Sequence, residues 1–272
     1  MTRPLVVRRL RIDLEAPFAR HWNGGDAFRT AWFNALSMSF PAGEQFFIDA
    51  VRAGVKRLPD AERDGFEREA QGFVGQEATH RRIHALFNAQ LARQGHVNAW
   101  EARILRRLRR LQGADPRHAV AITAATEHFT AILAEHLLTH PQWLDGAEPR
   151  LRTLWLWHAA EESEHRSTAF DLYRAMGGDE RRRRRWFVIV SWHLATDLLR
   201  QTVRNLAHDG ALWRASSWRS AAAFLFGRGG LVRHTFRPWL AYGSARFHPR
   251  QQGGELGAQW LKGNNEQYAS LG

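Results

Sequence analysis

The sequence predicts an all-α protein, a four-helix bundle with additional helices at both ends. Long segments carry apolar residues at helical spacing, and no convincing pair of strands can be picked out. Four of the helical segments also carry acidic and imidazole side chains in the order Glu, Glu-x-x-His, Glu, Glu-x-x-His. These residues are Glu44, Glu77, His80, Glu127, Glu162 and His165.

The elements follow one another in a simple order. A short extended arm is expected over residues 6–13, where basic and apolar residues alternate. Residues 26–58 have a helical pattern, and Pro41 predicts a break or a new helix start there. The other long helices are expected at 61–93, 117–139, 149–176 and 181–206. Residues 94–115, which include the basic amphipathic segment 97–111, would supply the long crossover that such a bundle needs between its second and third helices.

The chain is predicted to divide into a metal-binding helical bundle, residues 1–210, and a C-terminal amphipathic helical extension, residues 211–272. Residues 186–249 mix Trp, Phe, Leu and Arg in the manner of an interfacial amphipathic element, and the glycine-rich tail from Gln251 is expected to be weakly ordered. Two interpretations of the extension stay open. It packs on the bundle, or it contacts a membrane surface.

Composition excludes several classes of site. The 272 residues include no cysteine, which removes disulfides, iron–sulfur clusters and thiolate zinc sites. The formal net charge of +12 favours anionic surfaces. Nucleic acid is not an expected partner, because no recognition motif accompanies the arginines. The first 22 residues hold no apolar run of the signal-peptide kind. We therefore expect a cytoplasmic protein, with peripheral contact at the inner membrane face and homo-oligomerisation left open.

The repeated motif predicts a metal centre. Residues three apart on a helix lie about 60° apart around its axis, so each Glu-x-x-His presents both side chains on one face. Aromatic and aliphatic residues surround the motifs, and carboxylates in such surroundings are costly unless paired or coordinated. The sequence therefore predicts two metal ions held by the six side chains. Iron is the expected metal, with manganese and zinc as alternatives.

Some positions near the motifs have more than one interpretation. Glu161 lies in the same helical arc as Glu162, which is preferred because it keeps the three-residue spacing to His165. His128 follows Glu127 directly and faces another side of its helix. The candidates for additional ligands, or for hydrogen-bond partners of the ligands, are His84, His158, Glu161, His128 and Asp171.

Four sequence blocks carry a resemblance to a known family. They are residues 40–47, 76–84, 126–128 and 157–173, and they resemble the bacterial family described as "predicted metal-dependent hydrolase" over roughly residues 5–210. The family description implies hydrolysis. The ligand order is also similar to that of ferritin-like di-iron carboxylate proteins, in which oxygen chemistry dominates.

The functional expectation gives the residues more weight than the family description. We expect a di-iron carboxylate enzyme, an O₂-activating oxidase or oxygenase that acts on a small apolar organic substrate and takes electrons from a donor. One alternative is a hydrolase that uses a metal-activated water, since no Ser–His–Asp arrangement can be picked out. Another alternative is a non-catalytic bundle that binds or stores metal.

Overall fold

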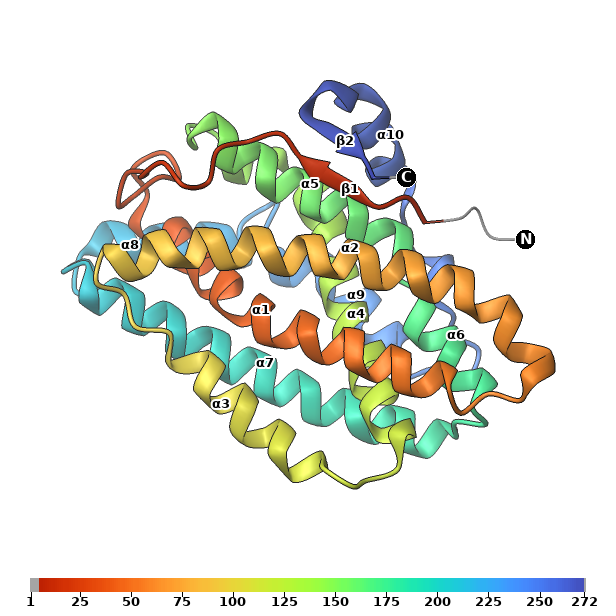
Figure 1. Ribbon diagram of the computed structural model, residues 1–272. Coiled ribbons are helices and arrows are strands. Elements are labelled where there is room, and N and C mark those ends of the chain that lie inside the picture. Colours follow the sequence, from red (N-terminus) through yellow and green to blue (C-terminus); the bar gives the residue numbers. More distant parts are fainter. Residues whose placement is uncertain (1–4, 272) are drawn as a thin grey trace.

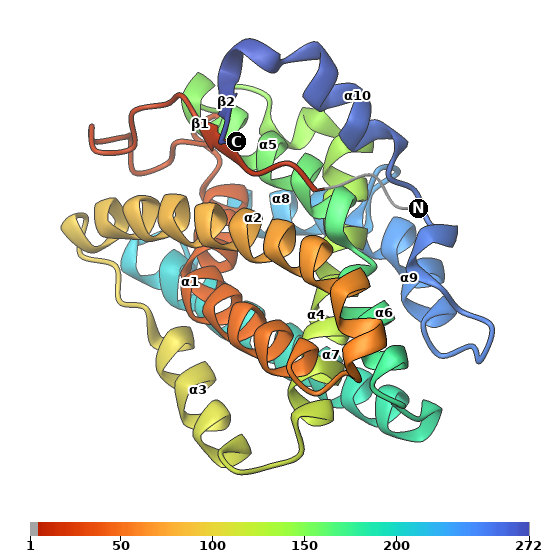
Figure 2. The ribbon, with the colours of Figure 1, turned by 45° about the vertical axis from the view of Figure 1, so that its right-hand side comes forward.

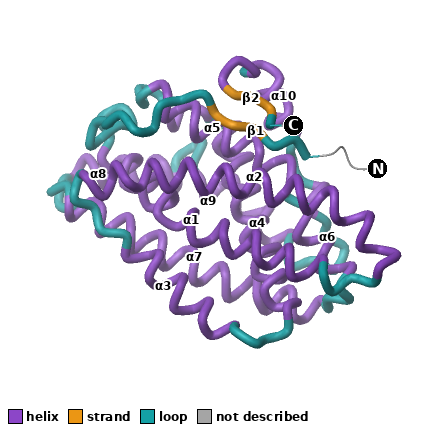
Figure 3. The backbone as a smooth tube through the Cα atoms, in the orientation of Figure 1, coloured by secondary structure: helices purple, strands orange, loops and turns teal. Residues whose placement is uncertain are grey.

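The computed structural model describes residues 5–271 and shows an all-α protein with one short pair of antiparallel strands (Figure 3). The predicted fold class is confirmed. The α-helices are α1 (Ala27–Val55), α2 (Asp60–Arg93), α3 (Ala99–Leu108), α4 (Pro116–Thr139), α5 (Pro149–His165), α6 (Thr168–Ala175), α7 (Glu180–His208), α8 (Ala215–Phe226), α9 (Leu231–Ala241) and α10 (Glu255–Gly263). The strands are β1 (Arg8–Leu10) and β2 (Tyr268–Ser270).

Four helices carry the repeated motif, namely α1, α2, α4 and α5 (Figure 1). Helix α1 packs along α2 and against α4, and α4 packs on α5. Helix α3 lies in the connection between α2 and α4, where the long crossover was expected, and it packs on α1 and α7 at one side of the molecule (Figure 2). The ferritin-like relation itself stays a prediction.

Helix α1 runs through Pro41 without interruption, so the predicted break is wrong. Proline has no backbone N–H, which leaves the carbonyl four residues earlier, that of Ser37, without its helical partner. The Asn88 side chain on α2 donates to this carbonyl at 2.9 Å. Because a neighbouring helix satisfies the free carbonyl, the helix continues and Glu44 keeps its place in it.

The fourth motif-bearing segment is shorter than predicted. Helix α5 ends at His165, and α6 begins at Thr168 after a two-residue turn. The expected single helix over residues 149–176 is therefore two helices. The break comes directly after His165, the last residue of the second Glu-x-x-His motif. Helix α6 therefore runs in a new direction, while His165 remains in the last turn of α5.

The C-terminal residues form a covering layer. Helix α8 packs on α1, α9 on α4, and α10 on α4 and α5. Strand β2 pairs antiparallel with β1, with Arg8 opposite Ser270 and Leu10 opposite Tyr268. The expectations of no strand pair and of a weakly ordered tail are thus wrong. The two strands are 260 residues apart in the sequence, and three residues each give too little pattern to recognise.

The arginine run at the start of α7 is only partly on the surface. Arg183 is fully buried and stacks on the Tyr242 ring at 4.7 Å. Its guanidinium donates to the Tyr242 and Ser244 carbonyls and pairs with Glu180. Within residues 5–271, no helix is long and apolar enough to cross a membrane.

Candidate metal centre

The six predicted side chains meet at one buried point between α1, α2, α4 and α5. His165 Nε2 lies 3.1 Å from Glu77 Oε1, 3.4 Å from Glu127 Oε2 and 3.5 Å from Glu162 Oε1. These contacts bring together three of the four helices. The convergence that the motif order predicts is present, whereas the role of the side chains as ligands remains a prediction.

The remaining two residues complete the cluster from the other side. His80 Nδ1 lies 3.4 Å from Glu162 Oε1. Ligand atoms of Glu44, Glu77 and His80 all lie within 4.8 Å of one another. All six residues are buried, since none has more than 3% of its surface exposed. Glu44 is therefore part of the cluster, although it lies on a helix that carries no histidine of the motif.

Hydrogen bonds outside the cluster orient both motif histidines. His165 Nδ1 lies 2.9 Å from Gln76 Oε1, and His80 Nε2 lies 3.0 Å from Glu161 Oε2. When each of these nitrogens donates its proton outward, the other nitrogen presents a lone pair to the cluster. Glu161 therefore serves as the partner of His80, and Glu162 faces the centre, as the three-residue spacing to His165 predicts.

The N-terminal arm supports this outer layer. Arg8 in β1 donates to Glu161 Oε1 at 3.0 Å and pairs with Glu164 at 2.6 Å. Gln76 Nε2 donates to Glu164 Oε2 at 2.8 Å. Since Glu161 and Gln76 hold the two histidines, the arm and its partner strand are linked to the cluster through charged hydrogen bonds. Arg8 and Gln76 were not among the residues predicted from the sequence; the position of Gln76 next to Glu77 was the one local signal.

A second chain of hydrogen bonds ends at Glu162. The Ser37 hydroxyl donates to Asn88 Oδ1 at 2.8 Å, so Ser37 Oγ accepts from His84 Nδ1 at 2.9 Å. His84 Nε2 then accepts from His158 Nδ1 at 2.8 Å. This leaves the His158 Nε2 lone pair directed at Glu162 Oε1, 3.1 Å away.

Two acceptors facing each other at this distance repel unless a cation or a proton lies between them. Burial and the neighbouring His158 hold the pKa of His84 well below its usual range. Burial and His80 lower the pKa of His158 to about 4, so both rings are neutral near pH 7. His158 is thus oriented as a further ligand, and His84 as the residue that orients it.

The carboxylates of the cluster lack ordinary partners. Neither oxygen of Glu44, Glu77 or Glu127 accepts a hydrogen bond from any residue within 5–271. Burial raises the pKa of all three, and carboxylate neighbours such as Glu162 add to the effect. Burial also opposes ionisation of Glu162, but the charge of the neighbouring His165 outweighs it and holds the pKa of Glu162 well below the usual range.

This donor set fits metal ions. Buried carboxylates without hydrogen-bond partners are costly unless they hold protons or coordinate cations. Oxygen and imidazole ligands together suit iron, manganese and zinc. The free oxygens and the inward-facing imidazole nitrogens of the cluster are the atoms that such ions would need.

Metal binding should release protons. The pKa of His80 is raised to about 10, because Glu161 and Glu162 outweigh the opposing effect of burial. The pKa values of Glu44, Glu77 and Glu127 are also raised, so the metal-free cluster holds protons at higher pH than isolated groups would. Ions must displace these protons, and apparent affinity should therefore rise with pH. Calorimetry with Mn²⁺ in buffers of different ionisation enthalpy measures the number released; zero protons at pH 7 would contradict this account.

Two of the candidate residues lie away from the centre. His128 Nε2 lies 3.1 Å from the Pro238 carbonyl on α9, and its ring packs among Tyr242, Phe187 and Phe247. Asp171 pairs instead with side chains of the C-terminal layer, His248 at 2.8 Å and Arg250 at 3.0 Å. Both therefore join the C-terminal layer to the bundle, and neither reaches the cluster.

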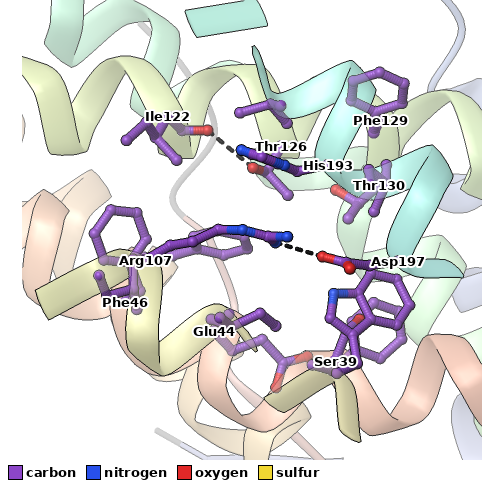
Figure 4. A pocket seen from close by; sticks show the side chains of 18 of the residues that line it. Ser39, Glu44, Phe46, Arg107, Ile122, Thr126, Phe129, Thr130, His193 and Asp197 are labelled. Atoms are coloured by element: carbon purple, nitrogen blue, oxygen red, sulfur yellow. Dashed lines mark hydrogen bonds and ion pairs between the residues drawn. The ribbon is translucent and has the colours of Figure 1, made fainter. Parts of the chain in front are cut away.

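A cavity of about 380 Å³ reaches the cluster at Glu44. Side chains of α1, α3, α4 and α7 line it, and most of them are apolar, including Leu36, Phe47, Ile122, Phe129 and Val190. Figure 4 shows Glu44 among these side chains, together with Arg107 and Asp197, which form an ion pair. Sites for small molecules typically have this size and an apolar lining with a few polar groups.

The family comparison agrees with metal dependence. The sequence profile of the family described as "predicted metal-dependent hydrolase" matches residues 6–253. The chain belongs to this family. The match extends past the expected limit near residue 210 and includes the segment that forms α8 and α9. No curated protein and no solved structure gives a significant match.

Membership in a metal-dependent hydrolase family changes the balance between the functional expectations. Metal dependence fits both the family and the His and Glu clusters of the structure. The expected oxidase or oxygenase activity receives no support from the family description, which fits the hydrolase alternative better. The number of metal ions and their identity stay predictions.

Proposed function

We propose that this chain is a dinuclear metal-dependent hydrolase that acts on an apolar substrate with a hydrolysable bond. The single observation that carries the proposal is the position of Glu44. It belongs to the buried cluster of carboxylates and histidines, and it also lines the apolar cavity. A molecule in the cavity would therefore have its reactive group beside the metal site.

The six residues would hold two ions. Glu77, His80, Glu162 and His165 would come from the two Glu-x-x-His motifs, with Glu44 and Glu127 added by α1 and α4. Bound divalent ions lower the pKa of a coordinated water and polarise the oxygen of an ester, amide or phosphate. The ions Mn²⁺, Zn²⁺ and Fe²⁺ all suit the donor set.

The residues of the chain perform the other tasks. Gln76 and Glu161 keep the two motif histidines in the orientation that leaves their inward nitrogens free. Burial of the whole cluster keeps bulk water away, which strengthens every charge interaction within it. The apolar walls of the cavity would hold the carbon skeleton of the substrate next to Glu44.

Hydrolysis is tested with protein reloaded with Mn²⁺ or Zn²⁺ under argon and assayed on p-nitrophenyl esters of increasing acyl length. We expect metal-dependent turnover without oxygen, with kcat/KM rising with acyl length because longer chains fill more of the cavity. The metal-free protein is the control. Absence of hydrolysis with either ion would contradict the proposal.

A second candidate function is the O₂-dependent oxidation of the same class of substrate. The observation that favours it is the ligand set, four carboxylates and two histidines in the order found in di-iron bundles. Two ferrous ions, if held by these four glutamates and two histidines, would supply electrons for the reduction of O₂. Under this alternative the Fe²⁺-loaded protein consumes O₂ on mixing with air, and the Mn²⁺ or Zn²⁺ form shows no turnover under argon.

Peripheral membrane contact also stays a proposal. Helix α7 exposes Val188, Trp192 and Leu199, which recur at helical spacing, and α3 exposes Leu105. Other side chains of these two helices line the apolar cavity. This arrangement, together with the net charge of +12, would suit an apolar substrate taken from an anionic lipid surface.

A further inference from the structure

Three histidines gather at a second place, at the end of α4 and on α9. His136 lies in the last turn of α4, His140 follows its end, and His234 comes from α9. One nitrogen of each lies within 4.8 Å of the others. The ring centroids of His140 and His234 are 4.3 Å apart, and those of His136 and His234 are 5.6 Å apart.

The nitrogens of this group are available for coordination. His140 Nδ1 lies 3.1 Å from the His136 carbonyl oxygen and donates to it, which leaves the Nε2 lone pair free. This hydrogen bond to the His136 carbonyl also fixes the orientation of the His140 ring, as is common for metal-bound histidines. The His136 side chain is 5% exposed, and neither of its ring nitrogens has a hydrogen-bond partner within residues 5–271.

The surroundings keep the His136 ring neutral. Burial lowers the pKa of His136 to about 3, and the proximity of His140 and His234 contributes. A buried neutral imidazole with two unpartnered nitrogens is an unsatisfied polar group, and a cation shared with two other imidazoles would satisfy it. The free carbonyls at the end of α4 also favour positive charge. Arg233 and Arg237 lie on the same helix as His234 and carry positive charge.

Glycine at position 229 leaves room for the group. A Cβ atom there would lie 2.8 Å from His140 Cδ2, which is too close for an ordinary contact. The backbone between α8 and α9 can therefore pass beside the His140 ring only because this residue lacks a side chain.

We propose that His136, His140 and His234 form a mononuclear site for a borderline divalent cation, Zn²⁺ in the first instance, separate from the carboxylate centre. Three imidazole nitrogens are a known zinc ligand set, with a fourth position left for water or another ligand. The bound ion would join α9, in the C-terminal layer, to the end of α4.

A second cluster with histidines is a weaker candidate. His96, His208 and Asp209 also bring ligand atoms within 4.8 Å of one another. However, the Arg20 guanidinium already pairs with Asp209 at 3.0 Å, and His208 Nε2 lies 3.1 Å from the Gln94 carbonyl. Because Asp209 already pairs with an arginine and His208 Nε2 already donates to a carbonyl, these two residues offer few free ligand atoms to a metal ion.

The test counts zinc per chain in the full-length protein after equilibration with Zn²⁺ and gel filtration. His234 is exposed, so His234→Ala should leave the core intact. We expect this variant, and His140→Ala, to hold one zinc fewer than the wild type, whatever number the carboxylate centre holds. His208→Ala is the matched control and should lose none.

The same zinc measurements can contradict the proposal in two ways. Equal zinc content in wild type and His234→Ala would overturn the proposal, as would a loss confined to His208→Ala. Zinc X-ray absorption adds a spectroscopic measure, since the difference between wild type and His234→Ala should show imidazole ligands and at most a water, with no carboxylate. Carboxylate scattering in this difference would place the lost ion at the carboxylate centre and would also overturn the proposal.

Discussion

Glu77→Ala should remove stoichiometric metal binding. Glu77 is fully buried, and its Oε1 lies 3.1 Å from His165 Nε2 in the middle of the cluster. Loss of a carboxylate at this point should weaken binding by more than the roughly 10–100-fold that follows from loss of an outer hydrogen-bond partner. His165→Ala should have the same effect. Elemental analysis of purified protein measures it, and metal-dependent turnover should disappear with the metal.

Two glutamates serve as controls for this result. Glu67 is exposed on the same helix as Glu77, and Glu67→Ala should keep the full metal content. Glu164 touches Arg8 and Gln76 but not the cluster, so Glu164→Ala should also retain its ions, with reduced affinity at most. Full metal occupancy in both Glu77→Ala and His165→Ala would show that the ligand assignment is wrong.

Ile122→Trp should abolish turnover of long apolar substrates while leaving the metal content unchanged. Ile122 lines the cavity from α4, and the larger indole would occupy space that the substrate needs. One methylene group in an apolar pocket changes kcat/KM by about 10–200-fold, so a side chain several carbons larger should cost at least about 100-fold. The assay compares p-nitrophenyl acetate with long-chain esters, and the long-chain esters should lose more.

The matched control for the cavity is Ile122→Val, which keeps a branched apolar side chain and should change kcat/KM only slightly. Binding of Nile red, an apolar fluorescent dye, gives a measurement independent of the reaction type. The dye should bind the wild type and Ile122→Val but not Ile122→Trp. Equal rates for long-chain esters in all three proteins would place the substrate outside this cavity.

The positions of the cluster residues could be predicted because their pattern is local. Glu77 and His80, and likewise Glu162 and His165, are three residues apart, and this spacing alone places both side chains on one helix face. The order of the motifs along the chain added Glu44 and Glu127. The same local reasoning preferred Glu162 to Glu161, in agreement with the outward position of Glu161 beside Arg8 and His80.

Features that depend on distant residues could not be predicted. Helix α1 continues through Pro41 because Asn88, on another helix, donates to the free Ser37 carbonyl. Arg183 stands in a run of five arginines, and only the fold brings the Tyr242 and Ser244 carbonyls to its guanidinium. A sequence pattern reports the propensity of a segment, whereas these outcomes depend on which polar groups other segments supply.

The C-terminal layer shows the same limit. Strand β2 forms because β1 offers a free edge to it, and its Tyr268 ring lies under the Arg8 guanidinium at 5.5 Å. Arg8 in turn pairs with Glu161, the partner of His80. The tail was expected to be weakly ordered, yet it pairs with the arm that contacts the outer partners of the carboxylate and histidine cluster. No local pattern in the glycine-rich tail could indicate this connection.

The central claim is that six side chains from four helices hold two metal ions at one buried point. Anomalous diffraction from crystals of the metal-loaded protein, recorded at the absorption edge of the bound metal, tests it most directly. We expect two anomalous peaks enclosed by Glu44, Glu77, His80, Glu127, Glu162 and His165. An absence of peaks between these side chains, or a metal bound only elsewhere, would contradict the account.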